Sequence, residues 1–368
     1  MRVTHFGKYF PPERGGIESV TETIVNGVKS KSLKINVVAF TSQSKAKLHE
    51  SHDNFQLYRC RESLVIKSQP ISVRYLLLCV ILGWRSDIIH MHYPNILSTL
   101  AVFFVSPSSR IVVHWHADIN FKGVLGWLVK PLTFLLKCRA SKIIYTSDNY
   151  MVSSERSMFF KKKSLVIPIG IASKPFSNFA NRNEREILFV GRLVPYKGLN
   201  VLLDALKFLQ KGVTVRIVGS GLQTSELHKM IASVSKRHKV VLHGSIDDAE
   251  LEYLFTRSTV FCLPSVNRLE AFGVVLLEAM RTGCPTIAAD IEGSGVPWVN
   301  SCGLNFENSN PNALAEVLDR LLGDVNLRQK IAEENFRSFS ESFTDEIMCE
   351  RFLNLYKELL SCKKLSGF

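Results

Sequence analysis

The chain has 368 residues, of which 46% are apolar and 21% charged, a composition typical of a folded globular protein and not of a disordered one. Its longest apolar run, Tyr75 to Trp84, is about half as long as a membrane-spanning helix requires, and the first residues read as a strand, not as a signal peptide. The eight cysteines form no C-x-x-C pair, which indicates reduced cytosolic thiols and argues against a disulfide framework or a structural zinc site.

The net charge of +13 lies entirely in the first half of the chain. Residues 1–172 carry 23 Lys and Arg against 10 Asp and Glu, whereas residues 173–368 carry 23 against 23. Segregated positive charge is typical of a surface that meets an anionic partner, so we expect an anionic membrane surface there. Nucleic acid is the alternative, but the basic residues follow no recognised nucleic-acid-binding motif and frame no platform of stacking aromatic rings.

Short β-rich runs alternate with helical segments along the first half. Strands are predicted at 3–6, 35–40, 55–59, 87–92, 110–114, 142–146 and 165–167. Helices are predicted over 18–29, 71–84, 95–105, 123–138 and 148–159. This alternation predicts a parallel sheet with helices on both faces. The polar, aperiodic segment 173–184 is typical of an interdomain linker.

The same pattern restarts after the predicted linker. Strands are predicted at 187–190, 214–218, 240–242, 260–263 and 286–288, with helices near 199–209, 222–234, 247–256 and 273–281, and a helical tail over 311–360. We therefore expect an amino-terminal domain over 1–172 and a second domain over 173–345. A carboxyl-terminal helix over 346–368 can cross back to the first domain.

The most specific segment is 264–280, which contains Glu270 and Glu278. A loop follows a strand here and leads into a helix near Gly273, whose first backbone N–H groups can bind phosphate or sugar hydroxyls. Gly273 allows close approach of a ligand, and the Glu278 carboxylate can accept hydrogen bonds from two adjacent ribose hydroxyls. The alternative is that both glutamates are ordinary surface acids of the helix.

A second loop, over 189–198, follows another predicted strand and carries Gly191, Arg192 and Lys197. Two cations on a glycine-flanked loop suit a diphosphate, with Arg192 as a fork and Lys197 as a point charge. Gly219 ends the next strand in the same way. The spacing is not that of a Walker A loop, so it does not predict a nucleoside triphosphatase.

Two further candidate groups lie in the first half. Gly15 and Gly16 separate the first strand from the first helix and expose backbone N–H groups to an anion, without the G-x-G-x-x-G dinucleotide pattern. His116 and His114 alternate at the end of a strand, as His90 and His92 do. Because no further ligand stands at a recognisable spacing, we expect no metal at either pair.

Segments 189–198 and 264–280, together with Gly15, Gly16 and Gly219, resemble the retaining glycosyltransferases of family 4, over almost the whole chain. The resemblance implies an α/β protein of the GT-B fold, with two Rossmann-like, doubly wound parallel-sheet domains facing a central cleft. It implies that Glu278 holds the nucleotide ribose and that Glu270 contacts the donor sugar. It also implies that backbone groups of Phe272, Gly273 and Val274 contact sugar hydroxyls and phosphate. Arg192 and Lys197 would bind the diphosphate, and His116 would lie near the sugar.

The segment 293–298 narrows the resemblance to bacterial enzymes that build O-antigen and other surface polysaccharides. The implied reaction moves a hexose, with mannose favoured, from a nucleotide-diphosphate sugar to a lipid-linked oligosaccharide at the inner face of the cytoplasmic membrane. We expect no cofactor and no metal, because no D-x-D pair is present. A sugar-nucleotide epimerase of related architecture is the alternative, although it would not explain the basic first half.

The membrane contact is predicted at residues 121–139, where apolar side chains alternate with Lys122, Lys130, Lys137 and Arg139. A helix of this kind can lie in the interface, with its apolar face in the acyl boundary and its cations on anionic headgroups. Packing of the same apolar side chains against the parallel sheet is the alternative.

Overall fold

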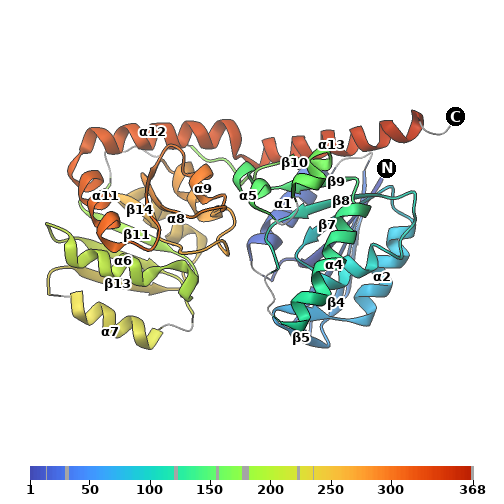
Figure 1. Cartoon of the computed structure of the whole chain (residues 1–368), viewed down its shortest axis with the longest axis horizontal. Coiled ribbons are helices and arrows are strands. Elements are labelled where there is room, and N and C mark those ends of the chain that lie inside the picture. The colour runs from blue at the N-terminus through green and yellow to red at the C-terminus, as the bar shows by residue number, and fades with distance from the viewer. Residues whose placement is uncertain are drawn as a thin grey trace. The chain divides into compact units, whose positions relative to one another are not determined.

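The computed structural model of the chain describes residues 1–13, 15–29, 33–119, 123–154, 157–175, 182–221, 224–234 and 236–365. The chain forms two compact units, which Figure 1 colours along the sequence. Unit 1 comprises Met1–Thr146, Ser154–Gly170 and Asp345–Phe368, and unit 2 comprises Ser147–Ser153 and Ile171–Thr344. Part of the predicted linker (176–181) and of the predicted membrane segment (121–122) lies outside the described residues.

Unit 1 contains an eight-stranded sheet in the order β10-β9-β8-β7-β1-β2-β4-β3. Every neighbouring pair is parallel except β3 with β4. The strands are β1 (Arg2–Tyr9), β2 (Lys34–Thr41), β3 (His49–His52), β4 (Phe55–Arg61), β7 (Ile88–Tyr93), β8 (Arg110–Trp115), β9 (Lys142–Tyr145) and β10 (Ser164–Val166). A separate hairpin joins β5 (Leu64–Ile66) to β6 (Gln69–Ile71).

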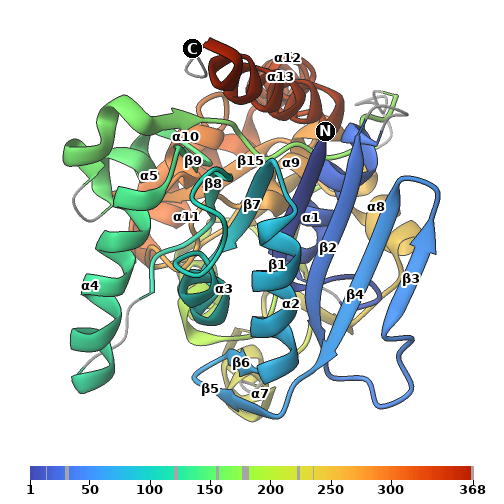
Figure 2. The ribbon, with the colours of Figure 1, turned by 90° about the vertical axis from the view of Figure 1, so that its right-hand side faces the viewer.

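Helices cover both faces of this sheet, as Figure 2 shows. On one face α1 (Gly16–Val28) packs against α13 (Asp345–Leu365), whose Tyr356 contacts His90 of β7. On the other face α2 (Val73–Trp84) places Tyr75 against Phe40 of β2, and α3 (Ile96–Ala101) lies between α2 and α4 (Val124–Arg139). Because both faces are covered, the central strand β7 is buried along its whole length.

Unit 2 contains a six-stranded parallel sheet in the order β13-β12-β11-β14-β15-β16. The strands are β11 (Glu186–Val190), β12 (Thr214–Val218), β13 (Lys239–Gly244), β14 (Val260–Leu263), β15 (Thr286–Asp290) and β16 (Leu304–Glu307). The helices are α5 (Asp148–Ser153), α6 (Leu199–Ala205), α7 (Thr224–Val234), α8 (Asp248–Arg257), α9 (Val274–Arg281), α10 (Val296–Val299), α11 (Pro311–Gly323) and α12 (Val325–Ser342). Short 3-10 turns complete the two units: η1 (Ser157–Lys163), η3 (Pro195–Lys197) and η4 (Leu206–Phe208).

The two sheets, which are parallel apart from the edge strand β3, are flanked by helices and confirm the predicted fold class, two Rossmann-like domains. The helix predicted over 148–159 was wrong in extent: α5 ends at Ser153, and η1 begins at Ser157. The two serines at the break, Ser153 and Ser154, compete with the helical backbone for hydrogen bonds. No helix in the described part of the chain has the length and apolar character needed to cross a membrane.

Candidate active site

The glycine loops of unit 2 interlock at the carboxyl ends of β11 and β12. The Gly191 N–H donates to Val218 O at 3.0 Å, and the Leu193 N–H donates to Ser220 O at 2.9 Å. Gly219 has φ +133°, and a Cβ there would lie 1.9 Å from Gly191 O. Only glycine therefore fits at position 219, and its absence of a side chain keeps the two loops together at the strand ends.

The loop after β11 brings Lys197 against the loop after β14. Gly198 adopts φ +67°, and a Cβ there would lie 1.9 Å from Pro264 O, so the two backbones touch. The Val266 N–H donates to Tyr196 O at 2.8 Å and fixes the same junction. The strands β11 and β14 are neighbours in the sheet, which explains why residues more than 60 positions apart in sequence meet here.

Lys197 and Glu270 form a buried ion pair at this junction. The Lys197 Nζ donates to Glu270 Oε2 at 2.5 Å, and each side chain is 11% exposed. Ser265 Oγ donates to the same carboxylate oxygen at 3.0 Å. The sequence assigned the cation to a diphosphate and the carboxylate to a sugar; the structure shows that each also holds the other in place. Neither the pairing nor the contribution of Ser265 was predicted.

Arg192 lies on the same loop but in a different environment. Its side chain is exposed, and its guanidinium donates to the Tyr196 hydroxyl at 3.2 Å. No ion pair involves it among the residues that the structure describes. Arg192 is therefore available to an incoming anion, whereas Lys197 must share its charge with Glu270.

The start of helix α9 is shaped by Phe272, Gly273 and Val274. Gly273 precedes the first helical residue with φ +79°, and no side chain caps the helix. The Phe272 ring is buried beside Trp298 and Phe343, so this residue can meet a ligand only through its backbone. The first N–H groups of α9 lack intrahelical partners and point along the helix dipole, which suits phosphate or a hydroxyl oxygen.

Glu278 of α9 is a half-buried carboxylate without a partner. No hydrogen bond to it is found among the described residues, and Arg281, three positions further along the chain, donates to Glu252 at 3.0 Å. Burial raises the pKa of Glu278 to about 7, opposed by Arg281 and reinforced by Asp248 and Glu252. A desolvated carboxylate with unused lone pairs is a strong acceptor for sugar hydroxyls.

In unit 1 the predicted anion site at Gly15 and Gly16 holds a carboxylate of the protein itself. Gly15 precedes the first residue of α1, and a Cβ at Gly15 would lie 2.2 Å from Glu18 Oε2. Glu18 is buried at the amino end of this helix, where the helix dipole favours negative charge. An external anion at this helix start would therefore have to approach beside Glu18. A Cβ at Gly16, by contrast, would have no atom within 4 Å of it.

His116 follows the end of β8 and is the least buried member of a chain of imidazoles. His116 Nε2 lies 3.1 Å from His92 Nδ1, and His92 Nε2 lies 3.2 Å from His5 Nδ1. The rings of each pair are nearly parallel, with tilts of 13° and 24°. Burial lowers the pKa of His5 and of His116 to about 3. These imidazoles are therefore neutral near pH 7. Each ring can donate a hydrogen bond from one nitrogen and accept one at the other, so all the hydrogen bonds along the row can run in the same direction.

The sequence showed the His-x-His pairs but not their assembly. Strand register aligns His5 with His90 and His92 with His114, which requires the order β1-β7-β8. Two groups of three nitrogen ligands result, each within 4.8 Å: His5 with His90 and His92, and His92 with His114 and His116. The missing third ligand, on which the expectation of no metal depended, is thus supplied by a neighbouring strand; the absence of a metal stays a prediction.

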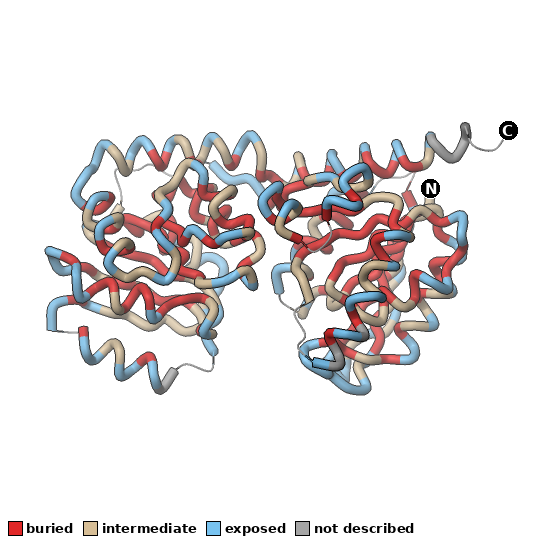
Figure 3. The backbone as a smooth tube through the Cα atoms, viewed as in Figure 1, coloured by how far each residue is buried: buried red, intermediate tan, exposed pale blue. Residues whose placement is uncertain are grey.

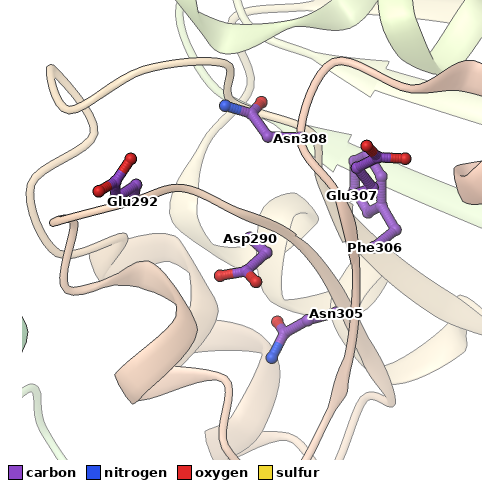
Figure 4. Close-up of a pocket in the computed structure, with 6 residues that line it drawn as sticks. All are labelled: Asp290, Glu292, Asn305, Phe306, Glu307 and Asn308. Atoms are coloured by element: carbon purple, nitrogen blue, oxygen red, sulfur yellow. The ribbon is translucent and has the colours of Figure 1, made fainter.

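A cavity of about 510 Å³ lies at the carboxyl ends of β15 and β16 (Figure 4). Its lining includes Asp290, Glu292 and Glu307. The rim residue Asn308 donates to Val266 O at 3.0 Å and so connects the cavity wall to the loop after β14. Three carboxylates make this cavity unsuitable for a diphosphate.

Comparison with known proteins gives consistent results. Residues 171–337 match the family model described as glycosyl transferases group 1. The O-antigen chain mannosyltransferase C of Escherichia coli is 29% identical over 375 residues, which cover 99% of this chain and 100% of the relative. The D-rhamnosyltransferase WbpZ of Pseudomonas aeruginosa is 29% identical over 331 residues, which cover 86% of each chain.

Solved structures agree on the fold. Anabaena Alr3699/HepE in complex with UDP and glucose superimposes with a TM-score of 0.76 at 19% identity, covering 97% of this chain and 100% of the other. The sucrose-phosphate synthase of Thermosynechococcus elongatus gives a TM-score of 0.76 at 18% identity, with coverage of 98% and 99%. With the two parallel sheets described above, these similarities establish the GT-B fold.

Proposed function

We propose that this chain, a glycosyltransferase of the GT-B fold, is a retaining enzyme of family 4 that transfers a hexose from a nucleotide-diphosphate sugar to a lipid-linked oligosaccharide. The observation that carries the proposal is the junction in unit 2, where Lys197, Glu270 and the start of α9 converge at the carboxyl ends of adjacent parallel strands. Ligands of open parallel sheets bind at this edge.

The cations act on the leaving group. Cleavage of the bond between sugar and diphosphate leaves negative charge on the departing phosphate oxygen. Arg192 is exposed and lies on the same loop as Lys197, so both can neutralise this charge, and the first N–H groups of α9 add dipoles with the same sign. Such preorganised donors stabilise a developing anion without a metal ion or another cofactor, and we propose neither.

The two glutamates have different roles because their environments differ. Glu270 is held by Lys197 and Ser265, so its position is fixed and it can contact the donor sugar. Glu278 has no hydrogen-bond partner among the described residues, so its carboxylate oxygens can accept hydrogen bonds from the two hydroxyls of a ribose. In a front-face transfer the acceptor hydroxyl attacks as the phosphate departs, its proton passes to the phosphate oxygen, and the configuration at the sugar is retained.

Mannose and O-antigen synthesis are the favoured substrate and pathway. The support is the full-length similarity to an O-antigen chain mannosyltransferase, together with the similarity to a D-rhamnosyltransferase. We assign acceptor binding to unit 1, keep His116 as the candidate for contact with the donor sugar, and place the enzyme at the inner face of the cytoplasmic membrane. The excess positive charge of residues 1–172 suits an anionic membrane surface and the diphosphate of a lipid carrier.

A thermal-shift screen of nucleotide sugars tests the donor assignment. A ligand at 100 times its dissociation constant stabilises its protein by about 2.7 kcal/mol, which corresponds to roughly 5 to 10 °C for a unit of this size. We expect GDP-mannose to give the largest shift, above UDP-glucose, UDP-galactose and UDP-N-acetylglucosamine, and Arg192→Ala to reduce it. A larger shift with a UDP-sugar would replace the mannose assignment, and no shift with any nucleotide sugar would contradict the proposed function.

A further inference from the structure

Helix α2 of unit 1 has an apolar side that no described part of the protein covers. Four of its large side chains are strongly exposed: Val73 (72%), Leu77 (56%), Ile81 (50%) and Trp84 (59%). The opposite side of the same helix is apolar as well and is buried in the unit. Exposed and buried residues accordingly follow one another along α2 (Figure 3). A helix with apolar side chains on two opposite sides is normally buried on both, so the outward side of α2 lacks a partner.

The four exposed side chains form one stripe. At about 100° per residue, they fall within roughly 80° of one another around the helix axis. Arg74 and Arg85 are exposed and lie within about 40° of the edge of this stripe, on the Ile81 side. The helix itself, Val73–Trp84, contains no acidic residue. An apolar stripe with cations along one edge is typical of a helix that lies in a lipid interface.

The stripe continues onto the neighbouring loop. Trp84 Nε1 donates to Phe104 O at 2.7 Å, which holds the end of α2 against the segment that follows α3. Phe103 and Phe104 are 39% and 63% exposed. We call the six side chains of Val73, Leu77, Ile81, Trp84, Phe103 and Phe104 the α2 surface. Contiguous exposed apolar patches of this kind mark interaction sites.

The charge around the α2 surface indicates an anionic partner. Residues 61–139 carry nine Lys and Arg against three Asp and Glu. All three acids are engaged inside unit 1: Glu62 accepts from the Tyr9 hydroxyl, Asp87 from the Arg2 N–H, and Asp118 from Trp115 Nε1. The segment that contains the α2 surface therefore carries a net charge of +6, which suits an anionic partner.

We propose that the α2 surface docks on an anionic lipid bilayer, with its apolar side chains in the acyl boundary and Arg74 and Arg85 on the headgroup phosphates. The inference rests on the proposed function, because a lipid-linked acceptor lies in a bilayer, and it moves the contact from the predicted segment 121–139 to α2. In that segment Trp127 and Leu135 are 76% and 51% exposed, but Val129 and Leu136 are buried in unit 1. Some of the apolar side chains of helix α4 thus pack in the core of unit 1, so α4 contributes less to the membrane contact than α2 does.

Sedimentation with vesicles tests the docking surface. The full-length protein is mixed at low salt with vesicles of phosphatidylglycerol in phosphatidylcholine, or of phosphatidylcholine alone. We expect binding to the anionic vesicles only, with release near 1 M salt, where charges are screened beyond about 3 Å. Leu77→Asp with Ile81→Asp, and separately Arg74→Glu with Arg85→Glu, are each expected to lower the bound fraction at least about tenfold. Val325→Asp, at an equally exposed apolar residue of unit 2 (55%), is the matched control and should bind like the wild type.

Three results would overturn the docking surface: unchanged binding of both double variants, equal binding to neutral vesicles, or a concentration-dependent dimer in ultracentrifugation that the Leu77/Ile81 variant abolishes. The last would assign the surface to a second copy of the chain. The stabilisation of each variant by nucleotide sugar, measured without vesicles, checks that unit 2 is intact. Loss of vesicle binding with donor stabilisation retained supports the surface, whereas donor stabilisation absent from the wild type would contradict only the proposed function.

Discussion

Replacement of Glu278 by glutamine should stabilise the free protein and weaken donor binding. The wild-type carboxylate is half-buried without a partner among the described residues, and burial raises its pKa to about 7 from an ordinary 4.5. The folded state therefore binds a proton more tightly than the unfolded state, and stability is lost as pH rises from about 4.5 to 7. A shift of this size corresponds to a cost of about 3 kcal/mol for the ionised carboxylate above pH 7.

The assay is urea unfolding of both proteins at pH 5 and pH 8. Glu278→Gln has no ionised carboxylate to desolvate, so we expect it to exceed the wild type by about 3 kcal/mol at pH 8 and by less than about 1 kcal/mol at pH 5. Titration with the nucleoside diphosphate should show the opposite order, with affinity reduced about tenfold because a charged acceptor is lost. Equal stability of the two proteins at pH 8 would show that the carboxylate is not held unpaired, and the reasoning about the ribose would fail with it.

Three further changes have outcomes that follow from the geometry. Lys197→Ala leaves the Glu270 carboxylate buried alone and should destabilise the protein by on the order of 3 kcal/mol in urea unfolding. In a double-mutant cycle, adding Glu270→Gln should largely reverse this loss. If the effects of the two substitutions simply added, the two side chains would not be coupled. Gly219→Ala forces a Cβ against Gly191 O and should lower both the unfolding temperature and the stabilisation by donor. Gly16→Ala, in a helix and with open space around it, should instead stabilise the protein by about 0.4–1 kcal/mol. His114→Phe removes a buried imidazole, and burial holds the pKa of that imidazole well below 6.5. The variant should therefore gain stability over the wild type as pH falls below 6.5 and differ little from it at pH 8, because the stability that the neutral imidazole contributes is lost in acid. If the free energies of unfolding of the variant and the wild type fell equally below pH 6.5, this prediction would be wrong.

The sequence predicted the layered fold because the strand and helix patterns differ in period. Strands such as β7 and β14 are short, apolar runs bounded by turns, and buried parallel strands have this form. Strand β3 was not predicted, because its residues, His-Glu-Ser-His, are polar and lack alternation. The order of strands within each sheet was not predictable either, since it depends on packing between segments far apart in the chain.

The same limit explains what the sequence missed in the site. The glycine loops and the residues Arg192, Lys197 and Glu270 could be placed at strand ends by local pattern alone. The ion pair between Lys197 and Glu270 depends on β11 lying beside β14, and the imidazole chain of His116, His92 and His5 depends on the order β1-β7-β8. One change in strand order would have separated these partners without altering any local pattern.

The outward side of α2 shows a different limit. The apolar run over 75–84 was visible in the sequence, and it fits a helix buried on all sides as well as one with a free side. Only the structure shows that Leu77 and Ile81 face away from the sheet while Tyr75 and Cys79 face it. Which side of a helix stays exposed depends on what the rest of the unit covers, and the spacing of apolar residues in the sequence does not predict it.

The most direct test of the central claim follows the reaction itself by proton and phosphorus NMR. Purified protein is incubated with GDP-mannose and a lipid-linked oligosaccharide acceptor, with Lys197→Ala as the control. The account predicts one GDP released for each new glycosidic bond, an anomeric configuration identical to that of the donor, and turnover lower by on the order of 10²-fold in the variant. An inverted product, or an isomerised nucleotide sugar formed without acceptor, would contradict it.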